Sequence, residues 1–260
     1  MSDGLIGHTG FVGGNLARQH GFAEFFNSKN IESIAGREFE LLVCAGAPAE
    51  KWKANRDPEN DRAAIQRLAA CAGKARAKFL ILISSVDVYP RPVAVDEDEF
   101  IVPGDSAYGR HRLLLEKYLQ DHFDTLIVRL PGLFGDGLKK NIIYDFLHGN
   151  RVDQVHADAS FQFYGLDTLW RDIETARQAN LRLINFATEP VSVAEVAREG
   201  FAREFTNRPA GATPSRYDFR SRHAALYGGQ AGYLQDRNTV LSKLREFVQR
   251  HTAANPTPKA

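Results

Sequence analysis

A glycine-rich loop near the N-terminus constrains the fold of this chain more than any other feature. Residues 4–6 form a short apolar segment, and Gly7, Gly10 and Gly13 follow it at intervals of three, just before a helical pattern over residues 11–20. The order of strand, tight turn and helix start is typical of a loop that binds the diphosphate of a dinucleotide. The helix N-terminus offers free N–H groups and a positive dipole end to that diphosphate. The residues predicted to bind the cofactor here are Gly7, His8, Thr9, Gly10, Phe11 and Val12.

Short apolar segments and helical patterns alternate through the first half of the chain. Such alternation predicts βαβ units and therefore an α/β fold, a Rossmann-type doubly wound parallel sheet. Two of the segments, 79–84 and 125–130, are too apolar to be half-exposed, as expected of central strands. The predicted strands are residues 4–6, 22–26, 40–45, 79–84 and 125–130, and the predicted helices are residues 11–20, 57–77 and 107–122.

After Gly132, proline, glycine, aspartate and aromatic residues become denser and the apolar runs shorter. We therefore expect a dinucleotide-binding core over residues 1–131 and a small mixed substrate-binding region over residues 132–251, parts of which rejoin the core. The tail 252–260 contains two prolines and is predicted to be disordered. Later predicted elements are a strand at 183–186, a helix at 192–202 that begins with a Ser192/Glu195 capping box, and an amphipathic helix at 239–250.

The charge and residue content exclude several classes of protein. The net charge is +1, from 33 basic and 32 acidic residues, which gives no electrostatic basis for binding nucleic acid or a membrane surface. The apolar runs are too short to cross a bilayer and the N-terminus has no leader pattern, so we expect a soluble cytoplasmic protein. The two cysteines fit buried, reduced thiols, and the histidines lack metal-ligand spacing, so no metal is predicted. Trp52 and Trp170 are predicted to lie in the core.

The end of the second predicted strand bears on the choice of cofactor. A carboxylate is expected there when the ribose 2′-hydroxyl is free, but this position falls at Asn27, Ser28 and Lys29. Lys29 and Ser28 favour a 2′-phosphate, so we predict NADP, with NAD as the alternative. The competing interpretation is that Lys29 is an ordinary solvated lysine.

A candidate catalytic group follows from two other segments. Ser84 and Ser85 end a buried strand, where the carboxyl edge of a parallel sheet faces its ligand. Tyr108 opens a helix, and Arg112 lies four residues later on the same helical face. A phenol with an ordinary pKa of about 10 exchanges protons more readily beside a positive charge, which favours the phenolate. The competing interpretation of Arg112 is a surface pair with Glu116.

Taken together, these motifs resemble the extended short-chain dehydrogenases/reductases, also called the NAD-dependent epimerase/dehydratase family. The resemblance covers nearly the whole chain. Two late segments match the family in order and spacing, which a chance glycine loop does not produce. The motifs that carry the resemblance are the glycine loop, Val43–Gly46, Asn60 before a helix, Ser84–Tyr89, Tyr108–Gly109, Arg129–Gly135 and Asn185–Ser192.

The resemblance implies hydride transfer at a sugar carbon, usually of a nucleotide-linked sugar bound by the C-terminal region. Carried over by position, Ser85 hydrogen-bonds the substrate oxygen and Tyr108 is the acid/base. Arg112 stands where the family has lysine, a substitution that is not conservative. The two helices at 57–77 and 106–122 match those of a four-helix homodimer interface in the family. The resemblance also adds Cys44, Ala45, Gly46, Ser84, Leu130 and Pro131 to the predicted cofactor contacts.

The predicted substrate residues depart from the family at several positions. Gly132 replaces a frequent asparagine, and Asp87 stands where dehydratases carry glutamate, without the preceding aspartate, so dehydration is disfavoured. Asn141 resembles a substrate-contacting asparagine, and Arg216 and Arg220 suit a diphosphate, with a solvated loop as the alternative. We therefore predict an NAD(P)-dependent reductase or epimerase of a nucleotide-activated sugar. The alternatives are a catalytically impaired dinucleotide-binding regulatory protein and a reductase of a non-sugar ketone.

Overall fold

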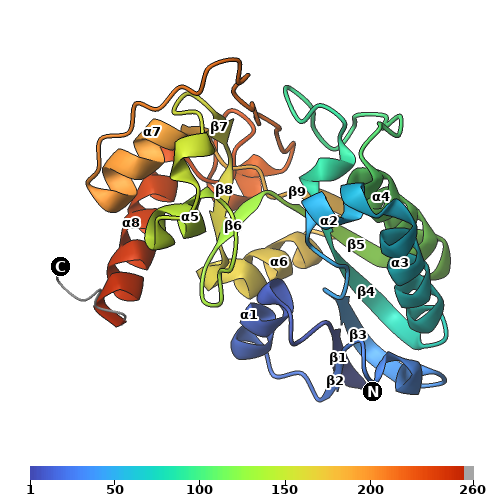
Figure 1. The fold of residues 1–260 in the computed structure, drawn as a ribbon. Coiled ribbons are helices and arrows are strands. Elements are labelled where there is room, and N and C mark those ends of the chain that lie inside the picture. Colours follow the sequence, from blue (N-terminus) through green and yellow to red (C-terminus); the bar gives the residue numbers. More distant parts are fainter. Residues whose placement is uncertain (255–260) are drawn as a thin grey trace. The chain divides into compact units, whose positions relative to one another are not determined.

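A six-stranded parallel sheet forms the centre of the first of two compact units in the computed structural model, which describes residues 1–254. The strand order is β2-β1-β3-β4-β5-β9 (Figure 1). All neighbouring strands run parallel, so the predicted Rossmann-type α/β fold is confirmed. The strands are β1 (Ser2–Ile6), β2 (Glu24–Phe26), β3 (Glu38–Cys44), β4 (Arg76–Ser85), β5 (Thr125–Leu130) and β9 (Leu183–Asn185).

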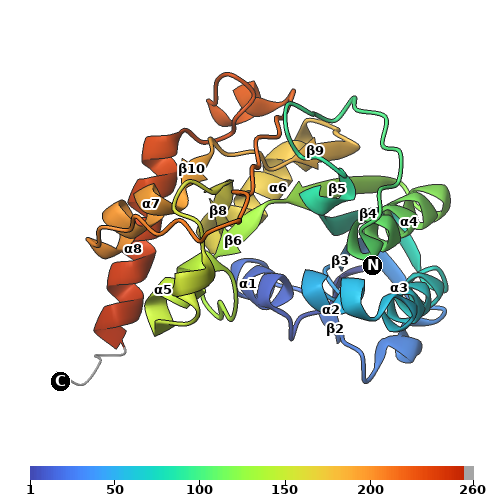
Figure 2. The same ribbon diagram turned by 45° about the horizontal axis from the view of Figure 1, so that its top comes forward.

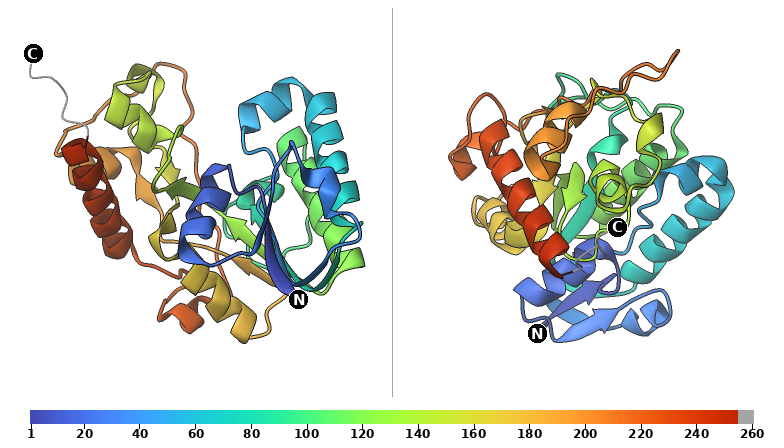
Figure 3. Two further views of the ribbon diagram at one scale, coloured as in Figure 1. Left: turned by 90° about the horizontal axis from the view of Figure 1, so that it is seen from below. Right: turned by 60° about the vertical axis from the view of Figure 1, so that its left-hand side comes forward.

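Helices cover both faces of this sheet (Figure 3). On one face α3 (Pro58–Ala72) and α4 (Ala107–His122) pack side by side, and on the other α1 (Phe11–Gln19) contacts α6 (Leu169–Gln178). The core beneath α3 and α4 is formed by large aliphatic side chains that all are at most 7% exposed. Burial of such side chains is the main force that holds a layer of helices on a sheet. These core residues include Ile6, Leu42, Leu80, Leu82, Leu68, Leu115 and Leu119.

The predicted helix over 57–77 is shorter in the structure, and the strand that follows begins earlier. α3 ends at Ala72, and β4 already pairs with β3 from Arg76 onward. Arg76 and Lys78 are exposed and alternate with less exposed neighbours. This half-exposed start of β4 lacks the dense apolar run that marked residues 79–84, which explains the misplaced boundary.

A short helix that the sequence analysis did not predict follows β3. Helix α2 (Lys51–Arg56) packs against the starts of α3 and α4 (Figure 2). Ala54 is its one buried residue, so it lacks the apolar periodicity by which a helix is recognised. Trp52 on α2 is 58% exposed, and the prediction that it lies in the core is therefore wrong. Trp170 is half-buried and stacks on His20, with 4.1 Å between the ring centroids.

The chain forms two compact units. The first comprises residues 1–91, 97–130 and 168–185, and the second comprises residues 92–96, 131–167 and 186 onward. Thus the chain leaves the first unit at the end of β5 and returns to it for α6 and β9, before its last stretch completes the second unit. No helix within residues 1–254 is long and apolar enough to cross a membrane.

The second unit contains two small sheets and three α-helices among its described residues. β6 (Gly132–Phe134) pairs with β8 (Phe163–Gly165), and β7 (Ser160–Phe161) pairs with β10 (Val191–Ser192). The Ser192/Glu195 capping box is confirmed, but the α-helix it opens is short and continues as the π-helical turn η5 (Val196–Gly200). Helix α8 reaches Ala254, inside the predicted tail, and residues 255–260 lie outside the described part. The helices are α5 (Ile142–His148), α7 (Val193–Glu195) and α8 (Arg237–Ala254).

Candidate active site

The glycine loop brings β1, β3 and α1 into close contact. Gly7 has φ +89°, a conformation that side chains rarely adopt, and a Cβ there would lie 2.4 Å from the carbonyl oxygen of Ala45. A Cβ at Gly13 would lie 2.1 Å from the carbonyl oxygen of Gly7. Any larger residue would therefore push α1 away from β1 or β1 away from β3. These two glycines fix the turn and the helix packing in the way that the sequence pattern predicted.

The start of α1 has the properties of an anion site. Gly10 is the N-cap and, lacking a side chain, cannot satisfy the first-turn N–H groups itself. The first turn of α1 contains no acidic residue, and His8 anchors the loop through a 3.1 Å contact between its Nδ1 and the Phe26 carbonyl oxygen. Thr9 and Gly10 are exposed, and Phe11 and Val12 are half-buried. The loop thus fits the diphosphate of a dinucleotide.

The loop after β2 holds the three residues that the sequence analysis linked to the ribose. The side chain of Asn27 accepts a hydrogen bond from the Lys29 backbone N–H, and Lys29 is exposed. Arg67, which the sequence analysis missed, extends from α3 and donates to the Ser28 carbonyl oxygen at 3.0 Å. Arg67 also pairs with Glu32. The structure therefore brings two cations to this loop, one from the loop itself and one from the neighbouring helix.

The end of β3 borders the glycine loop directly. Cys44 is fully buried, and burial raises the pKa of its thiol to about 11. The Ala45 backbone N–H donates to the Ile6 carbonyl oxygen at 2.9 Å. A Cβ at Gly46 would lie 2.9 Å from the Ile6 side chain, so this turn also depends on close approach. Cys71 is likewise free and buried.

Ser85 and Tyr108 come together at the carboxyl edge of the sheet. Ser85 ends β4, and Tyr108 lies in the first turn of α4, whose N-cap is Ser106. A Cβ at Gly109 would lie 2.2 Å from the Asp87 carbonyl oxygen, so α4 starts in direct contact with the turn after β4. The Ser85 hydroxyl lies near the Tyr108 phenol and lowers its pKa. The structure thus unites two residues that are 23 positions apart and were predicted to act together.

The surroundings of the Tyr108 phenol act on its ionisation in opposite directions. Tyr108 is 8% exposed, and burial raises its pKa above the usual value for a tyrosine. The Arg112 guanidinium is the strongest influence that lowers this pKa, and the Asp87 carboxylate raises it again. The nearby Ser85 hydroxyl and the charge of Lys51 lower it. Burial is the largest of these effects, so the phenol stays protonated at neutral pH.

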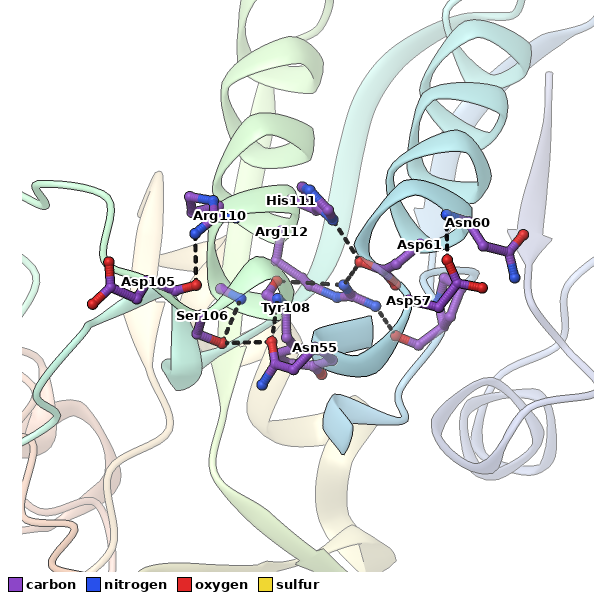
Figure 4. Close-up of polar contacts among 12 residues, drawn as sticks. Asn55, Asp57, Asn60, Asp61, Asp105, Ser106, Tyr108, Arg110, His111 and Arg112 are labelled. Carbon is purple, nitrogen blue, oxygen red and sulfur yellow. Dashed lines mark hydrogen bonds and ion pairs between the residues drawn. The ribbon is translucent and has the colours of Figure 1, made fainter. Parts of the chain in front are cut away.

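Arg112 is buried between α3 and α4 (Figure 4). Its Nη1 lies 2.5 Å from Oδ2 of Asp61, and its Nη2 donates to the Pro48 carbonyl oxygen. Nδ1 of His111 contacts the same Asp61 oxygen at 2.7 Å. The surface pair of Arg112 with Glu116 that we weighed as an alternative does not form. Arg112 instead faces the Tyr108 ring and Asp61.

Glu116 belongs to a separate buried network under the same edge of the sheet. It accepts hydrogen bonds from Ser84 Oγ at 2.5 Å and from Arg129 Nη2 at 2.6 Å. Arg129 Nη1 also donates to the Tyr89 hydroxyl at 2.7 Å, and Tyr89 bonds to Asn185 of β9. The Ser84 hydroxyl therefore points into the protein, toward α4, whereas Ser85 next to it meets Tyr108. Leu130, at the end of β5, is buried.

The remaining predicted residues lie in the second unit. Pro131 is half-buried just before β6, and Gly132 begins that strand, where a Cβ would lie 2.9 Å from the Gln162 carbonyl oxygen. Asn141 caps α5 by accepting from the Ile143 and Tyr144 N–H groups, and it donates to the Leu133 carbonyl oxygen. Its amide is therefore used within the fold.

Two arginines of the same unit have different surroundings. Arg220 pairs with Asp218 at 2.6 Å and lies over the Tyr233 ring, 4.1 Å from its centroid. Arg216 is exposed. Within residues 1–254, the structure contains no group of three or more His, Cys, Asp or Glu side chains that is arranged to hold a metal ion.

Comparison with known proteins gives a clear result only at the level of structure. No protein-family model matches the chain, and no curated protein matches it. A dTDP-4-dehydrorhamnose reductase ortholog from Clostridium acetobutylicum is 17% identical with a TM-score of 0.71, over 97% of this chain and 100% of that chain. The UDP-glucose 4-epimerase of Thermotoga maritima is 16% identical with a TM-score of 0.70, over 98% and 99% of the two chains.

A third solved structure, RMD from Pseudomonas aeruginosa in complex with NADPH, is 14% identical with a TM-score of 0.69, over 98% of this chain and 100% of that chain. Likeness at such low identity shows the fold and leaves the activity open. The chain has the Rossmann-type α/β fold that these three proteins share.

Proposed function

We propose that the protein is an NAD(P)-dependent oxidoreductase, a reductase or epimerase that acts on a carbonyl or hydroxyl carbon of a nucleotide-activated sugar. The neighbouring hydroxyl groups of Ser85 and Tyr108 carry this proposal, because they lie at the carboxyl edge of the sheet that also bears the glycine loop. Ligands of open α/β sheets bind at this edge. The solved structures of similar fold include a sugar-nucleotide reductase and an epimerase, in keeping with the same chemistry.

Each residue of the pair has a distinct task in this chemistry. A bound nicotinamide would supply or accept the hydride. Tyr108 gives a proton to the carbonyl oxygen during reduction or takes it from the hydroxyl during oxidation, and Ser85 holds that oxygen by a hydrogen bond. The raised pKa of Tyr108 keeps its proton in place at neutral pH, which suits donation to a carbonyl.

We further propose NADP as the preferred cofactor, with NAD as the alternative. Lys29 and Arg67 approach the loop where the 2′-phosphate of NADP would lie, and no carboxylate occurs at positions 27–29. Guanidinium and ammonium groups are the usual partners of a phosphate in such a loop. Glu32, which pairs with Arg67, would have to share it with the phosphate.

The sugar and its nucleotide are assigned to the second unit. Gly132, Asn141, Arg216 and Arg220 are the candidate contacts there, and Asp87 is the candidate in the first unit. Arginine suits the diphosphate of such a substrate. Asn141 is engaged in capping α5 and Arg220 in its pair with Asp218, which leaves the exposed Arg216 as the stronger candidate.

A homodimer is part of the same proposal. The outer surfaces of α3 and α4 are the surfaces that would pair, and Leu114 of α4 is 54% exposed there. An exposed leucine on a helix surface is common in monomers, so a direct test is needed. We expect Leu114→Glu to convert a dimer into a monomer in multi-angle light scattering at micromolar concentration. A wild-type monomer at that concentration would contradict the proposal.

A catalytically impaired dinucleotide-binding protein is the second candidate, because Arg112 is buried against Asp61 and not free for a ligand. The two candidates are separated by NADPH consumption with dTDP-4-dehydrorhamnose and by epimerisation of UDP-glucose. Turnover of either substrate, absent in Tyr108→Phe, supports the enzyme. Tight NADPH binding without turnover of these substrates or of simple ketones supports the second candidate. Turnover of the ketones alone favours a non-sugar reductase.

A further inference from the structure

The short helix α2 is fixed to the start of α4 by Asn55. Its Oδ1 accepts hydrogen bonds from the Tyr108 backbone N–H and from the Ser106 hydroxyl, both at 3.1 Å (Figure 4). A single side chain of α2 therefore satisfies an N–H group at the beginning of α4, where helices lack internal partners. Through Asn55, the position of α2 is coupled to the position of Tyr108.

Lys51 lies one helical turn before Asn55, and residues four apart share a face of a helix. On this face Lys51 Nζ lies 2.8 Å from Oδ1 of Asp87, and the Lys51 side chain is 43% exposed. Lys53, on another face of the same helix, pairs with Glu50 at 2.7 Å. Only the first of these two lysines is thus directed to the turn that carries Asp87.

Asp87 belongs to the 3-10 turn η2 (Val86–Val88), which connects directly to Ser85. Its backbone N–H donates to Ser85 Oγ at 3.1 Å, and its carbonyl oxygen touches Gly109, the residue after Tyr108. The Asp87 carboxylate is 20% exposed. A partly buried negative charge at this place disfavours a phenolate nearby.

Charged groups act on Tyr108 from three packed elements. Arg112 comes from α4 itself, Asp87 from η2, and Lys51 from α2. Asp61 of α3 pairs with Arg112 and also contacts His111, so the charge of Arg112 is partly balanced. Asp87 raises the pKa of Tyr108, and Lys51 lowers it. Of these charged groups, Lys51 and Asp87 are the ones that are partly exposed to solvent.

We propose that Lys51 is a positioning residue of this site, which holds the Asp87 carboxylate in an ion pair and offsets its negative charge beside Tyr108. The inference rests on the proposed proton transfer by Tyr108 for its biological meaning. Arg112, four residues after Tyr108, is buried in its ion pair with Asp61. Lys51 of α2 is a second cation at the same site. Lys51 acts on Tyr108 both through Asp87 and by its own charge, so its effect should be smaller when Asp87 carries no charge.

The test uses the full-length protein and no substrate. 3,5-Difluorotyrosine is placed at position 108, which lowers the phenol pKa into a range where the protein stays folded, and its titration is followed by ¹⁹F NMR. We expect Lys51→Met to raise the phenol pKa by about half a pH unit or more, because it removes a positive charge and the ion pair that holds Asp87. Asp87→Asn should lower it. Lys51→Arg should retain the wild-type value.

The double variant Lys51→Met/Asp87→Asn decides the mechanism, since Lys51→Met should raise the phenol pKa by less in the Asp87→Asn background than in the wild type. Lys53→Met is the matched control on α2 and should leave the titration unchanged. An unchanged titration in Lys51→Met overturns the inference, and so does an equal shift with and without the Asp87 charge. Failure of the proposed function would appear separately, as absence of turnover in the wild type while these shifts are still present.

Discussion

The guanidinium of Arg112 lies over the ring of Tyr108, with 3.8 Å between its central carbon and the ring centroid. Such a position favours the cation by its contact with the π face. Asp61 holds the guanidinium from the other side. Arg112 therefore acts on Tyr108 from a fixed, buried position. This position differs from that of a cation that contacts the ribose of a bound cofactor.

This geometry predicts that substitutions of Arg112 affect stability first. Arg112→Ala should lower the free energy of unfolding by about 3–5 kcal/mol, because it leaves Asp61 buried without its cation. Arg112→Lys should lower it by less, since an ammonium can keep the ion pair but not all the guanidinium bonds. Urea denaturation measures both. In an Asp61→Asn background the loss caused by Arg112→Ala should shrink, and equal losses in both backgrounds would contradict the pairing.

Cys44 predicts a pH dependence of stability. Burial raises the pKa of its thiol from 9.0 to about 11 in the folded protein. A group whose pKa is raised by folding contributes stability that is fully present below its unfolded pKa and is lost as the pH rises through its folded pKa. The wild type should therefore lose more stability than Cys44→Ala between pH 9 and about 11. A difference between the two proteins that stays constant over this range would contradict the prediction.

The loop after β2 predicts cofactor preference. Lys29→Ala and Arg67→Ala should each weaken NADPH binding by about tenfold, the size expected for one lost hydrogen bond to a charged group. NADH binding should change little, because it has no 2′-phosphate. Isothermal titration calorimetry measures both, and Arg62→Ala, an exposed arginine of α3, is the matched control. Equal affinity of the wild type for both cofactors would remove these residues from the account.

Those parts of the fold that depend on local patterns were predicted well from the sequence. Helix α4 and strand β5 lie at the predicted bounds, since a long helical period and a dense apolar run are strong signals. The proximity of Ser85 and Tyr108 followed from the motifs and the family resemblance. The structure places the two residues close together, at the end of β4 and the start of α4.

Features that depend on tertiary contacts were not predictable. In the sequence, Lys51 and Arg67 look like ordinary exposed lysine and arginine residues. Only the packing of α2 and α3 shows that Lys51 contacts Asp87 and that Arg67 contacts the loop after β2. Asp61 became the partner of Arg112 because α3 and α4 lie side by side, whereas sequence spacing suggested Glu116. Glu116 was already engaged by Arg129 of β5.

The most direct test of the central claim is the substitution Tyr108→Phe, assayed together with cofactor binding. Removal of one hydroxyl changes the shape of the site little, so NADPH should bind with wild-type affinity in calorimetry. Turnover of dTDP-4-dehydrorhamnose or UDP-glucose, whichever the wild type uses, should fall by about 10²–10⁴-fold, the usual contribution of a general acid or base. Full turnover by Tyr108→Phe would contradict the account, because the proton would then come from another group.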